Sequence, residues 1–442
     1  MEKVLVITYY WPPSGGAGVQ RWLKFCKYLP EFGIEPLVLT VREEDAAYPV
    51  IDDTFTKDIA TDLKVYKTPA KNFYRLYGTF KKGNKVPQGG APSGKKSLKS
   101  KISLALRNHL FVPDPRIGWN KEALKKAREI IEQEDITSIV TTSPPHSSQL
   151  IGLVLKKEFP KLKWTADLRD PWTDIYYYKD LKHSNWSDQA NIKKERAVLE
   201  NADDLVVVSP NMKKLFTSKG INAEKINIVP NGYDQADFNE LVKVQNEVFT
   251  ISYIGTANDD YDISAFLESL NELKSEGFEF HFNVIGVFSE EVKERISNIG
   301  LDSVVNYKGY LPHDEAIQYS QNADLLLLVI PKVENNKLIY SGKLFEYIAT
   351  ENPILCIGPV DGDAAELVGE NGFGASIDYL DKDGVKSFIE KVYRGFFSVA
   401  DSNIKLSYSR RNLSESIAKV LKIRGVWQIE LVQDLIKRGP ST

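Results

Sequence analysis

Short apolar runs recur along this chain, and helix-length amphipathic segments separate them. The first run, KVLVIT at 3–8, is followed by GVQRWLKFCKYLPEFG and then by a second run, EPLVLT. Strands that are apolar on both faces and alternate with helices are typical of parallel sheets covered on both sides. The sequence therefore predicts an α/β fold with doubly wound parallel sheets.

The alternation pauses and begins again near the middle of the chain. A polar stretch follows a Pro-Asn-Gly turn, and a new run, TISYIG, starts at Thr250. A chain of 442 residues with 42% hydrophobic residues can build two separate cores. We predict two Rossmann-like domains, at 1–232 and 249–403, joined by a hinge at 233–248. A C-terminal helical segment at 404–442 is expected to return to the first domain.

Composition argues against several classes of protein. The two cysteines, Cys26 and Cys356, lie in apolar segments, which argues against a disulfide framework and favours a reducing compartment. No stretch approaches the ~20 apolar residues of a membrane-spanning helix, and the first residues lack the pattern of a secretory signal. The sequence therefore predicts a cytoplasmic location.

The segment from 71 to 110 is rich in lysine and contains no Asp or Glu. Its part at 78–101 is rich in Gly, Pro, Ser and Lys, which predicts a mobile excursion. The pattern fits peripheral binding to an anionic inner membrane surface, and it equally fits a solvated loop with a helix packed on its own domain. Nucleic acid is not an expected partner, because no aromatic residue for base stacking lies between Lys81 and His109.

Three glycines, Gly15, Gly16 and Gly18, follow the first predicted strand and precede the first predicted helix. Such a turn offers backbone N–H groups and a helix N-terminus to an anion or a sugar. It does not match a dinucleotide fingerprint, because Arg21 stands where G-x-G-x-x-G needs its last small residue. A purely structural glycine turn is the alternative.

A second candidate site lies in SGKLFEYIATENPIL. Ser341 is the predicted N-cap of a helix that begins at Gly342, and Lys343 and Glu346 share one face of that helix. A lysine beside a helix N-terminus suits a diphosphate, and a carboxylate one turn further on can accept two hydrogen bonds from ribose hydroxyls. The alternative is an exposed ion pair without a binding role.

This segment resembles the nucleotide-sugar segment of GT-B glycosyltransferases of the retaining family 4. Further stretches follow in the order of that family: YYWPPSGGAGVQR, VVVSPNMKKLF, IVPNGYD, ISYIGT, NYKGYLPHDEAIQYSQNADLLLLV and GFGASID. The resemblance covers about residues 1 to 400. It implies a GT-B fold of two Rossmann-like domains facing across a cleft. It also implies transfer of a hexose from a nucleoside-diphosphate sugar to a glycan or lipid-linked acceptor, with retention, in surface polysaccharide or glycoconjugate synthesis.

The resemblance also implies roles for single residues. In the donor site Glu346 would hold the ribose, and Ser341, Gly342 and Lys343 would face the diphosphate. Gly255 and Thr256 would line the phosphate side of the site, and Leu311 or its neighbours would contact the nucleobase. Gly15 and Gly16 would approach the donor from the first domain. The expected catalytic residues are His146, beside the transferred sugar, with Arg169 and Asp170 after a strand end. If the reaction inverts, Asp170 or His146 should act as base.

The sequence departs from the family at two places. Leu338 stands where an acidic residue is usual, and the acidic ANDDYD replaces an Arg and a Lys after ISYIGT. Charge for the leaving diphosphate must then come from elsewhere, and the candidates are Lys343, Lys337, Lys332 and Arg169.

Neither a metal nor a cofactor is expected. The Asp-x-Asp pairs lie in turn-rich stretches, and no His and Cys cluster has zinc spacing. Two other functions stay open at this point: a nucleotide-sugar epimerase or phosphorylase on the same fold, and a nucleic-acid-binding protein.

Overall fold

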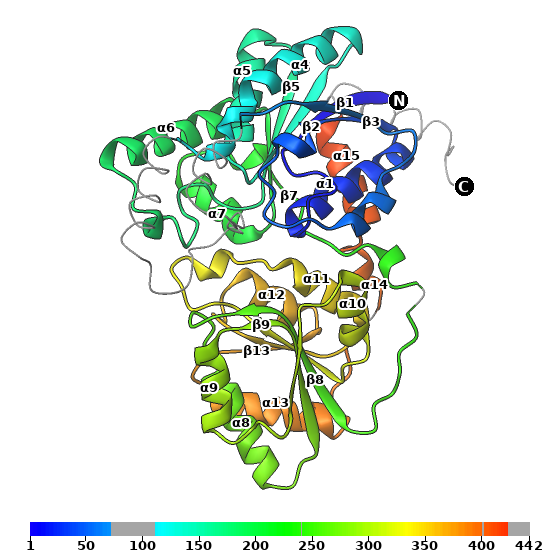
Figure 1. Ribbon diagram of the computed structural model, residues 1–442, viewed down its shortest axis with the longest axis vertical. Coiled ribbons are helices and arrows are strands. Elements are labelled where there is room, and N and C mark those ends of the chain that lie inside the picture. Colours follow the sequence, from blue (N-terminus) through cyan, green and yellow to red (C-terminus); the bar gives the residue numbers. More distant parts are fainter. Residues whose placement is uncertain (72–110, 240, 400–401, 423–442) are drawn as a thin grey trace, which may run out of the picture. The chain divides into compact units, whose positions relative to one another are not determined.

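The computed structural model describes residues 1–71, 111–239, 241–399 and 402–422 (Figure 1). The chain forms two compact units. Unit 1 comprises Met1–Val208, Met212–Pro230 and the C-terminal part from Leu413, and unit 2 comprises Ser209–Asn211 and Asn231–Asn412. The predicted excursion at 78–101 and the rest of the basic segment up to residue 110 lie outside the described residues.

Unit 1 is built on a seven-stranded parallel sheet with the order β3-β2-β1-β4-β5-β6-β7. Its strands are β1 Glu2–Ile7, β2 Ile34–Val41, β3 Lys64–Thr68, β4 Ser138–Ser143, β5 Lys163–Leu168, β6 Asp204–Val207 and β7 Ile226–Ile228. Its helices are α1 Ala17–Tyr28, α4 Asn120–Gln133, α5 Ser147–Glu158, α6 Asn185–Asn201, α7 Pro210–Ser218 and α15 Arg410–Leu421.

Unit 2 holds a six-stranded parallel sheet with the order β10-β9-β8-β11-β12-β13. Its strands are β8 Phe249–Ala257, β9 Phe280–Phe288, β10 Val305–Gly309, β11 Leu325–Val329, β12 Ile354–Ile357 and β13 Gly374–Ile377. Its helices are α8 Ser264–Ser275, α9 Glu290–Asn298, α10 His313–Gln321, α11 Gly342–Thr350, α12 Asp363–Glu370, α13 Lys382–Tyr393 and α14 Ser402–Leu406. The predicted doubly wound α/β fold is thus confirmed in both units.

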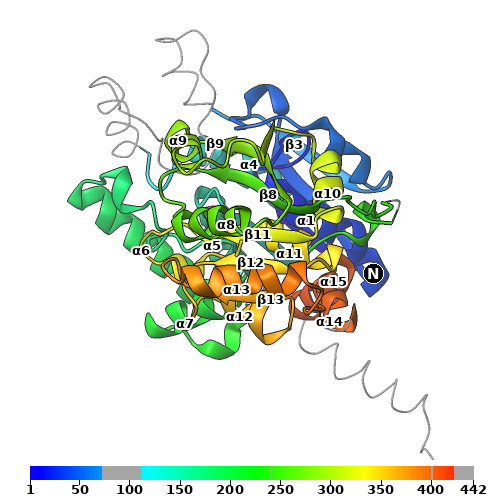
Figure 2. The ribbon, with the colours of Figure 1, turned by 90° about the horizontal axis from the view of Figure 1, so that it is seen from below.

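The continuous apolar run of β11 shows why these strands carry no alternation. Leu325, Leu327 and Val329 belong to one buried cluster of unit 2, whereas Leu326 and Leu328 belong to another. Successive side chains of a strand point to opposite faces of the sheet, so both faces are buried. Figure 2 shows α8 and α13 beside the sheet in unit 2.

Each sheet reverses its strand order at one place. In unit 1 the reversal lies between β1 and β4, and in unit 2 it lies between β8 and β11. Ligands of open parallel sheets bind at the carboxyl ends of the strands beside such a reversal. The loops after β1 and β4 contain Gly16 and His146, and the loop after β11 leads to α11 with Lys343. Topology therefore places these predicted site residues at the sheet edge where open parallel sheets bind their ligands.

A fully buried ion pair fixes α1 on the sheet of unit 1. The guanidinium of Arg21 donates two bonds to Asp167 Oδ1, 2.9 and 3.1 Å long, and further bonds to the carbonyls of Val229 and Pro230. Asp167 also accepts from Trp22 and Thr142, each at 2.7 Å. Arg21, which occupies the position of a third fingerprint glycine, is thus a structural residue.

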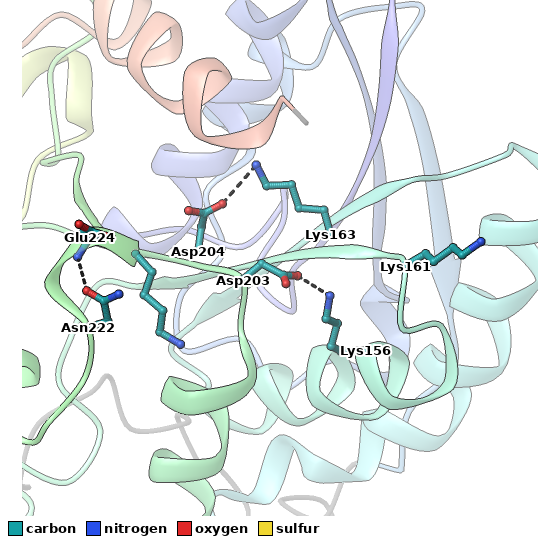
Figure 3. Close-up of a pocket in the computed structure, with 8 residues that line it drawn as sticks. Lys156, Lys161, Lys163, Asp203, Asp204, Asn222 and Glu224 are labelled. Carbon is teal, nitrogen blue, oxygen red and sulfur yellow. Dashed lines mark hydrogen bonds and ion pairs between the residues drawn. The ribbon is translucent and has the colours of Figure 1, made fainter. Parts of the chain in front are cut away.

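A cavity of about 400 Å³ lies at the amino ends of β5, β6 and β7, far along the strands from the loops just described (Figure 3). Three of its lysines donate to main-chain carbonyls: Lys156 to Leu162, Lys163 to Lys422 and Lys225 to Ala202. Lys156 and Lys163 also pair with Asp203 and Asp204. Lys163 and Lys225 thus bond carbonyls just after the carboxyl ends of α15 and α6, where the helix dipole attracts cations.

We predict that Arg21→Met lowers the free energy of unfolding by about 3–5 kcal/mol, because it leaves the buried Asp167 carboxylate without its partner. Denaturant titration of the purified variant measures this change. The matched control is Arg128→Met, which breaks an exposed pair with Glu158 and should cost no more than about 1 kcal/mol. Equal losses in the two variants would show that burial of the pair contributes nothing.

Candidate active site

In unit 2 the predicted site residues gather at the first turn of α11. Ser341 is the N-cap residue, but its side chain makes no capping hydrogen bond, and the first turn contains no acidic residue. The backbone N–H groups of this turn therefore lack a side-chain acceptor, and they carry the positive end of the helix dipole. Such a helix start favours an anion.

Lys343 projects from this turn toward the end of β8. Its ammonium lies 3.2 Å from the Tyr253 hydroxyl and 4.2 Å from the centre of that ring. Burial lowers the pKa of Lys343 to about 8, and the Glu346 carboxylate opposes this shift. A β-carbon on Gly255, whose φ is +131°, would lie only 3.0 Å from the Lys343 Nζ atom. The structure thus brings Lys343 and Gly255, two of the predicted donor-site residues, into contact.

Glu346 lies one turn further along α11. Burial raises the pKa of its carboxyl, while His313 is the largest influence that lowers it. The His313 Nε2 atom is 3.8 Å from Glu346 Oε1, and both side chains are about one-fifth exposed. Sequence reasoning missed His313, although it stands only two residues after Leu311 at the start of α10.

The other predicted residues of unit 2 are less closely involved. Thr256 is exposed near the end of β8, and Leu311 is half-buried in the loop before α10. Within the described part of the chain, no hydrogen bond or ion pair joins either of them to Lys343 or Glu346. Their roles toward a ligand stay predictions.

The acidic stretch after β8 is paired with basic residues of its own unit. Lys332 approaches Asp262 at 3.4 Å, and Arg295 approaches Asp259 at 3.2 Å. Lys337, another candidate cation, pairs with Asp361 outside that stretch. Both lysines are exposed, so these pairs are weak. Of the candidate cations in unit 2, Lys343 is the one that lies at the start of α11.

In unit 1 the glycine turn leads directly into α1. Gly16 is its N-cap residue with φ +91° and ψ 166°, a conformation that only glycine adopts readily. Gly15 is required by packing, because a β-carbon there would lie 2.9 Å from Asp52 Cβ. A β-carbon on Gly18 would lie 3.3 Å from an Arg169 guanidinium nitrogen, so Arg169 covers the start of α1. Arg169 itself donates to the Ser143 carbonyl at 3.2 Å.

His146 and Asp170 lie beside Arg169. The His146 ring stacks on Trp172, with 5.0 Å between ring centres and 11° between ring planes. Burial lowers the pKa of His146 to about 3, aided by Arg169, so the imidazole is neutral near pH 7. Its Nδ1 atom is buried and has no hydrogen-bond partner among the described residues. Burial raises the pKa of Asp170, and Arg169 opposes that shift. The structure thus brings the three predicted catalytic residues of unit 1 together.

In the described ranges no group of three or more His, Cys, Asp or Glu side chains is arranged to hold a metal ion. No described helix is long and apolar enough to cross a membrane.

Comparison with known proteins finds one family match and several similar folds. The family description "Glycosyltransferase Family 4" matches residues 88–237. A sucrose-phosphate synthase from Thermosynechococcus elongatus is 13% identical, with a TM-score of 0.56, over 99% of this chain and 100% of that one. HepE from Anabaena, solved with UDP and glucose, is 13% identical, with a TM-score of 0.55, over 98% of this chain and 100% of that one. The lipopolysaccharide outer core galactosyltransferase WaaB is 12% identical, with a TM-score of 0.57, over 95% of this chain and 99% of that one.

At these identities the solved structures show the fold alone, and the family model matches residues 88–237, which are less than half of the chain. Together they confirm the predicted resemblance: the chain has a GT-B fold, and residues 88–237 match glycosyltransferase family 4. A comparison with curated protein sequences finds no significant match.

We predict that nucleoside diphosphate affinity depends on the charge of Lys343. In the free protein its pKa is about 8, and a bound diphosphate should raise that pKa because it favours the ammonium. Affinity should therefore be constant below about pH 8 and fall by up to about tenfold per pH unit above it. Calorimetric titrations between about pH 7 and about pH 9.5 measure this, with proton uptake at the higher pH. A flat profile with no proton uptake would contradict a diphosphate contact with Lys343.

Proposed function

We propose that this protein transfers a hexose from a nucleoside-diphosphate sugar to a glycan or lipid-linked acceptor, with retention of configuration. The observation that carries the proposal is the start of α11, where Lys343 and open backbone N–H groups lie one turn from Glu346. No metal or cofactor is part of the proposal.

Unit 2 is proposed to bind the nucleotide part of the donor. The N-terminal turn of α11 and the Lys343 ammonium would face the diphosphate, and the Glu346 carboxylate would accept hydrogen bonds from the ribose. Negative charge grows on the diphosphate as the bond to the sugar breaks, so fixed positive groups there lower the barrier most. The structure of HepE with UDP and glucose supports this choice of ligand, because that protein shares the fold.

Unit 1 is proposed to bind the sugar that is transferred and the acceptor. A general base works best when its pKa lies near the working pH, and the pKa of His146 lies far below it. His146 is therefore assigned as a neutral hydrogen-bonding partner of the sugar. The acceptor proton would pass to the leaving phosphate oxygen, which gives same-face attack and retention. Asp170, with its raised pKa, is the base to test if the product proves inverted.

The biological setting is proposed more broadly. WaaB, which shares the fold, acts on the outer core of lipopolysaccharide, and this supports a role in surface glycan synthesis. We propose a cytoplasmic protein that works on the inner face of the membrane. Of the basic segment 71–110 only Lys71 lies within the described residues, so membrane binding by that segment stays a prediction.

We predict that one or more nucleoside diphosphates raise the melting temperature of the wild-type protein. A ligand at 100 times its dissociation constant adds ~2.7 kcal/mol, which is several degrees for a domain of this size. Glu346→Ala should abolish the response, whereas Glu370→Ala, an exposed carboxylate at the end of α12, should keep it. A wild-type protein that responds to no nucleotide would sink the proposal. Product analysis then separates transfer, which needs an acceptor, from epimerisation or phosphorolysis.

We predict that Gly16→Ala lowers turnover more than nucleotide affinity, because Gly16 belongs to unit 1 and the proposed nucleotide contacts belong to unit 2. Steady-state kinetics and calorimetry separate the two effects. Gly33→Ala is the control, since Gly33 also has a positive φ but ends the short helical turn after α1. Equal losses of turnover and affinity in the Gly16 variant would contradict the assignment.

A further inference from the structure

Helix α6 departs from the pattern of an ordinary surface helix along most of its length, although its last turns bury Val198 and Leu199. Ser187, Asn191 and Glu195 repeat every four residues and form a polar stripe that is fully buried or nearly so. On the solvent side, Trp186 is 68% exposed and Ile192 is 41% exposed. A surface helix normally buries its apolar residues and exposes its polar ones. A buried polar stripe together with an exposed tryptophan is therefore the informative feature of α6.

The buried stripe has a structural task that explains its polarity. Asn191 accepts a hydrogen bond from the Trp172 indole at 3.0 Å, and Glu195 accepts one from the Thr173 hydroxyl at 2.7 Å. Lys219 neutralises Glu195 at 2.8 Å. The inner face of α6 thus holds the segment whose Trp172 stacks on His146. Among the described residues of unit 1, no hydrogen bond gives the exposed Trp186 or Ile192 a comparable task.

Basic residues accompany the exposed apolar ones. Lys182 precedes α6, and Lys193 lies two turns after Trp186 on the same side; both are exposed, and neither forms an ion pair with a described residue. Arg196 is also exposed but is paired with Glu200 at 2.7 Å. We call Lys182, Trp186, Ile192 and Lys193 the α6 outer patch. Figures 1 and 2 both show α6 at the edge of unit 1.

We infer that the α6 outer patch binds the surface of an anionic lipid bilayer. The tryptophan is amphipathic and prefers the headgroup level of a membrane, while an isoleucine supplies apolar area and lysines attract acidic headgroups. A protein partner or a second copy of the chain would bury the apolar residues equally well. The two lysines without ion-pair partners favour the acidic lipid surface. The same helix that contacts the bilayer then positions the His146 and Trp172 pair, and this contact is independent of the donor nucleotide.

The test is flotation of the full-length protein with vesicles. Wild type should float with vesicles of phosphatidylcholine and phosphatidylglycerol in equal parts and much less with phosphatidylcholine alone. Trp186→Ala should lower the bound fraction several-fold, and Trp186→Phe should largely restore it. Lys182→Glu with Lys193→Glu should weaken binding by at least about fivefold per lysine. Unchanged melting temperatures would show that these surface variants are folded.

Matched controls change similar residues elsewhere. Phe396→Ala removes an aromatic side chain that is 72% exposed on unit 2, and Lys157→Glu with Lys161→Glu reverses two exposed charges on unit 1. Both controls should float like wild type. Equal flotation of Trp186→Ala and wild type would overturn the inference. So would a dimer of the wild type that Trp186→Ala dissociates, because a second copy would then occupy the patch. The melting response to nucleotides should persist in every variant, so failure of this surface is distinct from failure of the donor assignment.

Discussion

The ion pair between Arg21 and Asp167 sets the geometry on which unit 1 depends. A buried carboxylate is tolerated only when its oxygens are fully bonded, and here Arg21, Trp22 and Thr142 supply the donors. The pair joins α1 to β5 and, through two carbonyls, to the chain after β7. Gly16 caps the start of α1, and Arg169 stands two residues after Asp167. The ion pair therefore helps to position both the glycine turn and the catalytic candidates.

Burial lowers the pKa of a basic side chain in each unit, with different consequences. In unit 2 it brings the pKa of Lys343 down to about 8, so that its charge responds to a bound anion. In unit 1 it removes the charge of His146 altogether near neutral pH. Under the proposed function, the first effect would favour a leaving diphosphate in unit 2, and the second would leave the His146 imidazole a weak base in unit 1. The proposed proton transfer to the leaving phosphate oxygen rests on these two effects.

Local pattern was sufficient to predict the fold but not all of the site. The run LLLLV predicts a strand buried on both faces, and β11 shows it. The start of α11 was predictable because Ser341, Lys343 and Glu346 lie close in sequence. Arg21 was interpreted only as a departure from a fingerprint, since its partner lies 146 residues away. The contact of His313 with Glu346 and the outward position of Trp186 also depend on tertiary packing, which periodicity does not reveal.

The way in which Lys163 holds the end of α15 has an evolutionary consequence. Its ammonium donates to the main-chain carbonyls of Val420 and Lys422, and every residue type carries such a carbonyl. These two hydrogen bonds therefore depend on the path of the main chain and not on the side chains of α15. Val420 and Lys422 can therefore change side chain without loss of these two hydrogen bonds, although Leu421 between them is held by its place in the core, whereas a change at Lys163 would remove both bonds in one step.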